Sequence, residues 1–173
     1  MPEKNKTNIR ELARMALVAA LYAALTLAIQ PLSYGAVQLR LSEMLVLLCF
    51  YRRSYAPALT LGCFIANLFS PFGLYDIIFG TLATAVAVFP MFYVKNIWLA
   101  ALLPVLSNGI IVGFELFLCG EPLWFSMGSV ALGELCVIAA GTLLFRLALE
   151  RSAVFMRVIG SQKHPRKKPM NAD

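Results

Sequence analysis

Ionisable side chains interrupt the apolar runs of this 173-residue sequence, which is 60% hydrophobic and only 14% charged. Inside a bilayer such a group costs about 2.5–3.5 kcal/mol on insertion scales, so it is usually functional or paired. Glu115 and Glu134 are the hardest to explain structurally, because each is a lone carboxylate in an apolar run. We therefore expect each of them to bind a ligand or a proton.

Other polar side chains lie near the ends of the apolar runs. A carboxylate accepts two parallel N–H hydrogen bonds from a planar, amidine-like group, so acids suit a cationic or donor-rich ligand. Asn108 and Glu115 are seven residues apart and therefore share one face of a helix. The candidate binding residues are Gln38, Arg40, Glu43, Asn67, Asp76, Asn108, Glu115 and Glu134.

Simpler structural roles remain open for some of these residues. Asp76 follows a turn signal at residues 70–73 and therefore also suits a cap at the N-terminus of a helix. Arg40 and Glu43 are close enough in sequence to pair mainly with each other. A further acid, Glu121, is expected in a loop, where it would simply be solvated.

Six apolar segments must position these side chains, and the sequence predicts an all-α integral membrane bundle. A spanning helix needs about 20 largely apolar residues. The predicted segments are residues 9–29, 39–51, 55–69, 76–94, 97–118 and 123–149. The second and third are short, and together they could instead form one re-entrant hairpin, which would leave four spans. Both counts are even, so both place the two termini on the same side.

The distribution of basic residues predicts the orientation. With six spans and a cytoplasmic N-terminus, all of the 15 Lys and Arg residues except Arg40 lie on the cytoplasmic side. Cytoplasmic loops of membrane proteins carry this excess of positive charge. We therefore expect residues 1–8 to be a cytoplasmic segment, 9–150 the transmembrane domain and 151–173 a basic cytoplasmic tail, disordered from Ser161 onward. We expect a multi-pass protein of the cell membrane, namely the bacterial plasma membrane.

This orientation places the candidate binding residues in the outer half of the bundle. The acids there far outnumber the single Arg40, which implies an outward-facing, acidic and partly buried pocket. Aromatic side chains nearby could stack on a ring or close the site, namely Tyr34, Phe72, Tyr75 and Trp124.

Several other classes of function are disfavoured. The net charge of +6 could indicate nucleic acid, but the placement of the charges fits topology and anionic lipid instead. The four cysteines form no CxxC pair and the only histidine, His164, lies in the basic tail, so no metal or other cofactor is expected. A GxxxxGK[ST] loop is absent, so the chain itself does not hydrolyse ATP.

The first segment contains a ladder of small residues that recur every fourth position. Small residues at this spacing form a flat stripe against which another helix can pack closely. The stripe could face the protein's own helices or a partner subunit. Its members are Ala16, Ala20, Ala24 and Ala28.

Several separate stretches follow a known pattern in the same order. They are Gln38-Leu-Arg-Leu-Ser-Glu43, Gly62-Cys-Phe-Ile-Ala-Asn67, Ser70-Pro-Phe-Gly-Leu-Tyr-Asp76, Gly80-Thr-Leu-Ala-Thr84, Asn108 to Glu115 and Leu132-Gly-Glu-Leu135. Together with the six helices, the alanine ladder and the outer pocket, they resemble the substrate-binding S components of energy-coupling factor (ECF) transporters, and more closely the QueT-type component for queuosine precursors, over about residues 10–150. The extended basic tail is not part of this pattern.

The resemblance implies a substrate of the 7-deazaguanine class, such as preQ1 (7-aminomethyl-7-deazaguanine) or preQ0. Glu115 or Glu134 would bind the base edge, and Glu43 or Asp76 the ammonium group. Arg40 would meet the carbonyl oxygen or hold Glu43, and the remaining ring atoms would be bound by Gln38, Asn67 and Asn108. The resemblance also implies that the first helix binds a transmembrane coupling subunit and that two cytoplasmic ATPases drive import.

The sequence leaves three other functions open. The chain could be an S component for a different vitamin-like ligand, although an anionic vitamin would want more outer-side basic residues than Arg40. It could be an intramembrane enzyme with Glu115 and Glu134 as an acid/base pair, but it has no HExxH motif and no nucleophile elbow. A membrane subunit that binds only partners would leave the outer acids unexplained.

Overall fold

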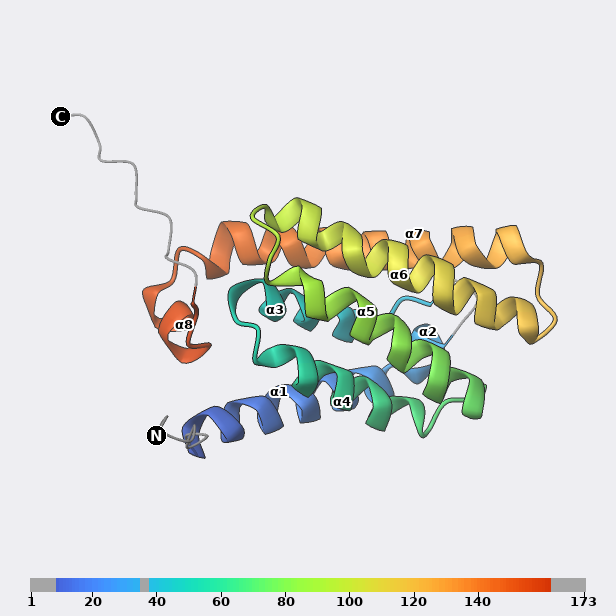
Figure 1. The fold of residues 1–173 in the computed structure, drawn as a ribbon, viewed down its shortest axis with the longest axis horizontal. Helices are drawn as coiled ribbons and strands as arrows, with labels where there is room; N and C mark the ends of the chain where they lie inside the picture. The colour runs from blue at the N-terminus through green and yellow to red at the C-terminus, as the bar shows by residue number, and fades with distance from the viewer. Residues whose placement is uncertain (1–8, 35–37, 163–173) are drawn as a thin grey trace, which may run out of the picture.

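The structure is a computed structural model that describes residues 9–34 and 38–162. These residues form helices and turns, and no strand occurs among them (Figure 1). Three elements depart from α-helical geometry: η1 is a 3₁₀-helix, and η2 and η3 are π-helical. In order the elements are α1 (Ile9–Ala28), α2 (Gln30–Ser33), η1 (Leu41–Leu47), α3 (Leu48–Tyr51), α4 (Tyr55–Asn67), η2 (Asp76–Gly80), α5 (Thr81–Met91), α6 (Ile97–Leu118), α7 (Leu123–Leu144), η3 (Phe145–Leu149) and α8 (Ala153–Val158).

The prediction of an all-helical protein is confirmed. By length and composition, three helices of the described chain are suited to crossing a membrane, at Ile9–Ala28, Ile97–Leu118 and Leu123–Leu149. Shorter apolar helices cover Leu41–Tyr51 and Asp76–Met91.

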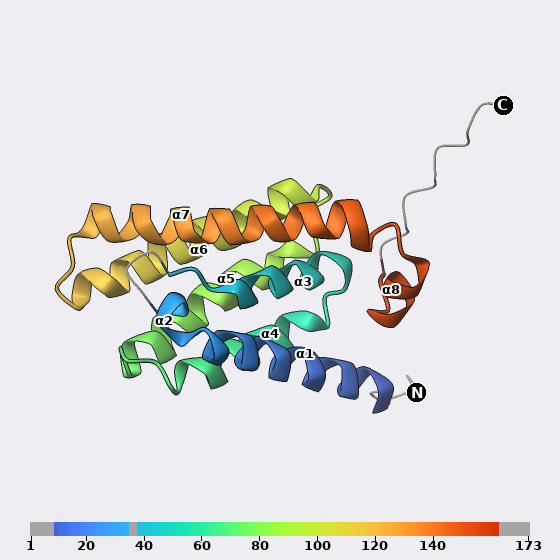
Figure 2. The ribbon, with the colours of Figure 1, turned by 180° about the vertical axis from the view of Figure 1, so that it is seen from behind.

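The helices form three layers (Figures 1 and 2). α1 lies beside α4 along one side of the bundle, α6 lies beside α7 along the other, and α3 and α5 lie between these pairs. Small residues allow the close approaches. A Cβ on Gly62 would be 2.7 Å from the Ala19 oxygen, and a Cβ on Gly113 would be 2.6 Å from Met127 Cα. Glycine at these two positions therefore sets the spacing within the two outer pairs.

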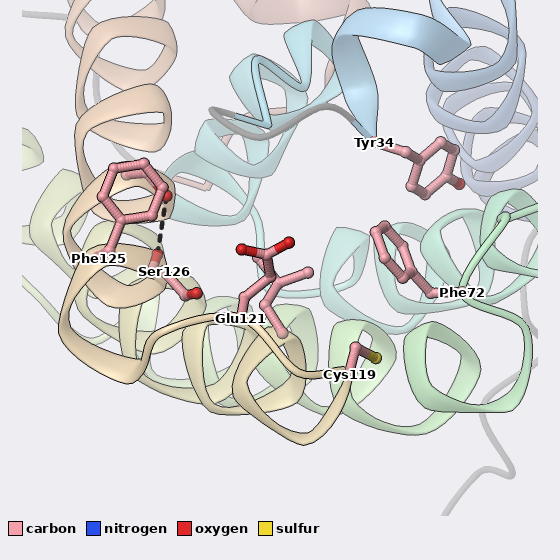
Figure 3. A pocket seen from close by; sticks show the side chains of 8 residues that line it. Tyr34, Phe72, Cys119, Glu121, Phe125 and Ser126 are labelled. Atoms are coloured by element: carbon pink, nitrogen blue, oxygen red, sulfur yellow. Dashed lines mark hydrogen bonds between the residues drawn. The ribbon is translucent and has the colours of Figure 1, made fainter.

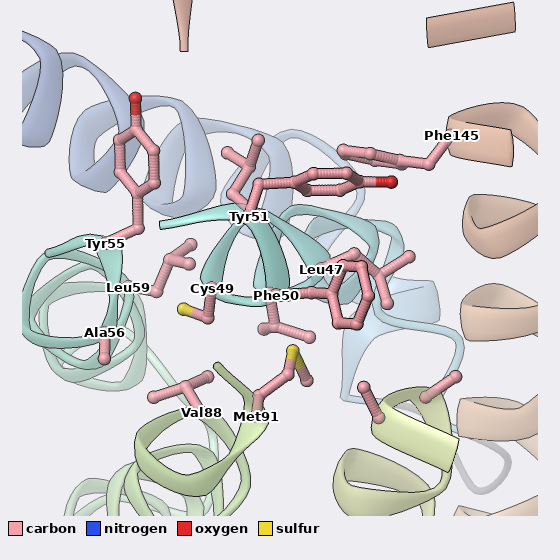
Figure 4. Packing of buried hydrophobic residues seen from close by; sticks show 14 of the residues in the cluster. Leu47, Cys49, Phe50, Tyr51, Tyr55, Ala56, Leu59, Val88, Met91 and Phe145 are labelled. Carbon is pink, nitrogen blue, oxygen red and sulfur yellow. The ribbon is translucent and has the colours of Figure 1, made fainter. Parts of the chain in front are cut away.

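An apolar core fills the half of the bundle that contains α3 (Figure 4). Leu47, Cys49 and Leu59 are fully buried, and Met91 of α5 packs against them. The Tyr51 ring stacks on Phe145 with ring centroids 5.7 Å apart. Two members of this core also contact the polar candidate residues: Tyr22 bonds to Glu43, and Cys63 accepts from Arg40. The apolar core and the polar site are therefore adjacent.

The sequence did not predict α8, which lies within the region expected to be a tail. The Ser152 side chain caps this short helix by accepting a hydrogen bond from Phe155 N at 3.2 Å. After α8 the chain folds back onto the turn between α3 and α4. The Tyr55 hydroxyl donates to Ile159 O at 2.8 Å, and Arg52 donates to Gly160 O at 2.7 Å. The predicted N-terminal segment 1–8 and residues 163–173 of the predicted tail lie outside the described residues.

Candidate functional site

Arg40 lies at the centre of the buried polar residues and is only 4% exposed. Its Nη2 is 3.8 Å from Asp76 Oδ1, and its guanidinium carbon is 5.0 Å from the centre of the Tyr34 ring. The charges of Glu43, Glu115 and Glu134 also interact with it. Acids from η1, η2, α6 and α7 are thus gathered around one cation.

Glu43 is held by the first helix. The Tyr22 hydroxyl donates a hydrogen bond to Glu43 Oε1, and both side chains are fully buried. Next to this pair, the hydroxyl oxygens of Thr26 and Ser42 are 2.6 Å apart. The buried face of α1 therefore fixes the beginning of η1. Arg40 forms its ion pair with Asp76, so the expected alternative of a mainly Arg40–Glu43 pair does not describe this arrangement.

Asp76 is held by the turn that precedes it. Ser70 Oγ donates to Asp76 Oδ2, and Asn67 Nδ2 donates to the Asp76 main-chain oxygen at 2.8 Å. The N-cap residue of η2 is Tyr75, whose side chain makes no capping hydrogen bond, and the Asp76 carboxylate accepts from Ser70. Gly80 gives the Asn67 amide its space, because a Cβ there would be 2.8 Å from Nδ2. The carboxylate is thus directed toward Arg40 rather than used as a helix cap.

Glu115 and Glu134 face the same region from the outer pair of long helices. Glu115 of α6 is 0% exposed, and its charge lies close enough to interact with the charge of Asp76. Glu134 of α7 is 3% exposed; its charge interacts with that of Glu43, and its side chain lies beside Asn108. Asn108 and Glu115, which were predicted to share one face of a helix, are both buried in α6. The two long helices therefore bring both isolated carboxylates to the cluster.

Several buried polar atoms of this cluster have no hydrogen-bond partner within the part of the chain that the structure describes. Buried polar groups are normally hydrogen-bonded, and each unsatisfied one costs about 1–3 kcal/mol. Unsatisfied acceptors outnumber unsatisfied donors, so the arrangement suits a ligand rich in N–H groups. The acceptors are Glu43 Oε2, Asp76 Oδ1, both oxygens of Glu115 and Glu134 Oε1, and the donors are Gln38 Nε2 and Arg40 Nη2.

Gln38 contacts the cluster through its main chain. It is buried, and its backbone φ of 40° lies in the left-handed region that few residues other than glycine adopt. Its main-chain oxygen accepts a hydrogen bond from Arg40 N at 3.0 Å. Strained backbone of this kind often occurs at functional sites, and here it directs the chain into the segment that holds Arg40.

A cavity of about 190 Å³ lies next to the cluster (Figure 3). Tyr34 connects the two, since its ring lines the cavity and also lies against Arg40. Of the expected stacking residues, Tyr34 and Phe72 line this cavity, whereas Tyr75 and Trp124 are exposed and do not. The lining residues are Tyr34, Phe72, Leu116, Cys119, Glu121, Phe125, Ser126 and Ser129.

The alanine ladder lies on the exposed face of α1. All four of its members, Ala16, Ala20, Ala24 and Ala28, are exposed. The opposite face of the helix is buried, and it includes the Ala19 that contacts Gly62 as well as Tyr22 and Thr26. One helix thus presents a flat outer surface and a polar inner surface that contacts the site.

Sequence reasoning missed Tyr22, Thr26 and Phe125. Glu121 lies in the loop after α6 and is exposed, as expected, and it also lines the cavity. Tyr22 and Thr26 are four residues apart on the face opposite the ladder, and that spacing was the available signal. Nothing in the sequence marks Phe125 as a lining residue. No group of three or more metal-ligating side chains suited to a metal ion occurs within residues 9–34 and 38–162.

Comparison with known proteins gives matches to transporters. A protein-family model described as QueT transporter matches residues 12–151. The curated protein Queuosine precursor transporter QueT of Lactococcus lactis subsp. cremoris is 41% identical to this chain over 83 residues. The alignment covers 47% of this chain and 48% of that protein, so the chain spans about half the length of the curated relative it matches. No solved structure matches the chain significantly.

Proposed function

This chain belongs to the QueT transporter family, and we propose that it is the substrate-binding S component of an ECF transporter that captures a queuosine precursor at the outer face. The family description and the name of the curated relative both denote transporters rather than enzymes. The resemblance noted in the sequence is therefore a resemblance to its own family, and the finer assignments below rest on the site.

The observation that supports this proposal most directly is the set of unsatisfied carboxylate oxygens around one arginine. The ligand is a 7-deazaguanine such as 7-aminomethyl-7-deazaguanine, whose guanine-like edge offers N–H donors and whose aminomethyl group is a cation. Glu115 or Glu134 accepts from the base edge, since both project from long helices and have unsatisfied oxygens. Glu43 Oε2 or Asp76 Oδ1, the oxygens of these two residues that accept no hydrogen bond from any described residue, meets the ammonium group.

The remaining polar residues complete the proposed site. Arg40 Nη2 is an unsatisfied donor and is assigned to the carbonyl oxygen of the ligand. Asn108, beside Glu134, and Gln38 bind the other ring atoms. Asn67 already donates to the Asp76 main chain, so its contribution is to hold Asp76 in place as well as to border the ligand.

We also propose six membrane-embedded segments with both termini cytoplasmic. Basic residues collect at one end of the bundle, where Arg52 pairs with Glu11 at 2.7 Å and binds the chain after α8. The helix at Leu41–Tyr51 has a length of about 20 Å and cannot cross about 30 Å of hydrocarbon alone. It lies between the two outer helix pairs, which shield its backbone from lipid, as irregular segments at membrane depth require.

The proposed partners are a transmembrane coupling subunit and two cytoplasmic ATPases. The coupling subunit packs against the exposed alanine ladder of α1, where small side chains permit a close helix–helix contact. The chain supplies no ATP-binding loop, so the energy for import comes from these partners.

Equilibrium binding to purified variants tests the proposed site. Without ATP, the wild-type protein should bind radiolabelled 7-aminomethyl-7-deazaguanine, and Glu115→Gln or Glu134→Gln should weaken binding at least tenfold, which corresponds to about 1.4 kcal/mol. Glu150→Gln is the matched control, because Glu150 accepts from Tyr51 at the opposite end of the bundle. Equal affinities for all three variants and the wild type would reject the assignment of the site.

Binding of other ligands tests the alternative. An S component for a different vitamin would prefer that vitamin over the 7-deazaguanine in a competition experiment. We expect anionic vitamins to compete poorly, because Arg40 is the single cation that the described residues place among the acids of the cluster.

A further inference from the structure

The cavity beside the cluster has its own chemistry and shares no lining residue with the predicted binding set. We propose that it is a separate outer site, built around Glu121, Phe72 and Phe125, that captures a planar, cationic ligand before the ligand reaches the buried acids. This inference rests on the proposed function of the chain as a receptor for a cationic 7-deazaguanine.

Glu121 provides the charge of this outer site. Its carboxylate points into the cavity (Figure 3) and is accessible to solvent. The preceding Gly120 has a φ of 102°, and Glu121 N donates to Leu116 O at 3.1 Å, so the turn after α6 fixes the position of the acid. Glu121 forms no ion pair with any described residue. An incoming cation is therefore free to take this position.

Aromatic rings provide the walls. Phe72, from the turn before η2, and Phe125, in the first turn of α7, line the cavity together with Tyr34. Flat aromatic faces attract cations and stack on planar rings. Hydroxyl groups of Ser126 and Ser129 add polar contacts at the side of α7. One carboxylate, flat apolar walls and a few hydroxyls suit a planar ring that bears an ammonium group.

Two residues join the outer cavity to the buried cluster. Tyr34 is the wall between them: its ring lies against Arg40, and its hydroxyl donates to Ala66 O at 3.0 Å. On the other side, Phe72 N donates to Ser70 Oγ at 3.1 Å, and the same hydroxyl donates to Asp76. A ligand in the cavity is thus one side chain away from Arg40. The outer site therefore precedes the buried site on the path inward.

This position predicts an effect on the rate of association. An exposed carboxylate at the mouth of a site raises the local concentration of a cation and speeds its entry, and salt weakens the effect. Once the ligand has moved to the buried acids, Glu121 no longer holds it. Substitution of Glu121 should therefore slow association and leave dissociation unchanged, which distinguishes it from Glu115 and Glu134.

Rapid-filtration kinetics on the full chain in lipid nanodiscs test this inference. For radiolabelled 7-aminomethyl-7-deazaguanine at low ionic strength, Glu121→Gln should reduce the association rate constant by about threefold or more, with an unchanged dissociation rate constant. The difference should shrink at high salt, and it should be absent for neutral 7-deazaguanine. Glu150→Gln, the same substitution at the opposite end, is the matched control. Phe125→Ala should also slow association, because it removes an aromatic ring that lines the cavity.

The outcomes separate this inference from the proposed function. Wild-type protein that binds neither compound overturns the proposed function and the outer site with it. Wild-type binding with equal association rates for Glu121→Gln and Glu150→Gln overturns the outer site alone. A Glu121→Gln variant that instead loses ligand faster places Glu121 in the final site and also overturns the inference.

Discussion

Removal of the Tyr22 hydroxyl tests whether the first helix holds the ligand site in place. In the structure this hydroxyl donates to Glu43 Oε1, while Glu43 Oε2 has no partner among the described residues. The substitution Tyr22→Phe keeps the ring and its packing, so it removes one hydrogen bond and little else. Glu43 is 1% exposed, and water cannot readily replace the lost donor.

The size of the effect follows from the charge of the acceptor. A hydrogen bond to a charged group contributes about 1.5–3 kcal/mol. Without it, an ionised Glu43 becomes costlier by that amount, and the proposal that Glu43 meets the ammonium group requires the ionised form. At 1.4 kcal/mol for each factor of ten, affinity for 7-aminomethyl-7-deazaguanine should fall about tenfold or more.

Tyr55→Phe is the matched control. Tyr55 is also buried and also donates one hydrogen bond, to Ile159 O at 2.8 Å, but it does so at the end of the bundle where the chain folds back after α8. Isothermal titration should show weakened binding for Tyr22→Phe and wild-type affinity for Tyr55→Phe. Thermal unfolding experiments should show that both variants are folded. Equal affinities in the two folded variants would refute the role of α1 in positioning Glu43.

Two further predictions concern helix packing. Ala20→Leu combined with Ala24→Leu should abolish uptake in cells that contain the whole transporter and spare ligand binding, since both side chains lie on the exposed face of α1. Ala140→Leu, at an exposed position of α7, is the control and should leave uptake intact. Uptake by the double variant would refute the proposed partner surface. Gly113→Ala should lower the unfolding temperature, because its Cβ would lie 2.6 Å from Met127 Cα. Gly128→Ala is the control, since its Cβ would meet nothing within 4 Å and the substitution should be neutral or stabilising. Equal unfolding temperatures for the two variants would contradict the packing of α6 on α7.

Local breaks in the sequence predicted the helix boundaries well. Gly120-Glu121-Pro122 separates α6 from α7, because proline and glycine disfavour continuation of a helix. α1 ends just before Gln30-Pro31, as expected, but these two residues begin the short helix α2, which the sequence did not predict. The same signals do not reveal the geometry inside a segment. The π-helical turn that begins at Asp76 is set by the contacts of Asn67 with Asp76 and Gly80, which only the folded chain brings together.

Some residues of the candidate site could be predicted from the sequence, and others could not. Isolated carboxylates such as Glu115 and Glu134 were identifiable, because a charge in an apolar run is costly wherever the helix lies. Their partners were not, because Tyr22 and Glu43 are 21 residues apart and meet only through the packing of α1 against η1. The fold-back of residues 159–162 onto the α3–α4 turn was also missed, since it depends on main-chain oxygens that any sequence would supply.

Equilibrium binding of 7-aminomethyl-7-deazaguanine to the purified wild-type chain, in the absence of ATP and of any partner subunit, tests the central claim most directly. The buried acids around Arg40 predict saturable binding with a dissociation constant in the micromolar range or below, and weaker binding of neutral 7-deazaguanine, which lacks the ammonium group. A dissociation constant no better than millimolar for the aminomethyl compound would contradict the account.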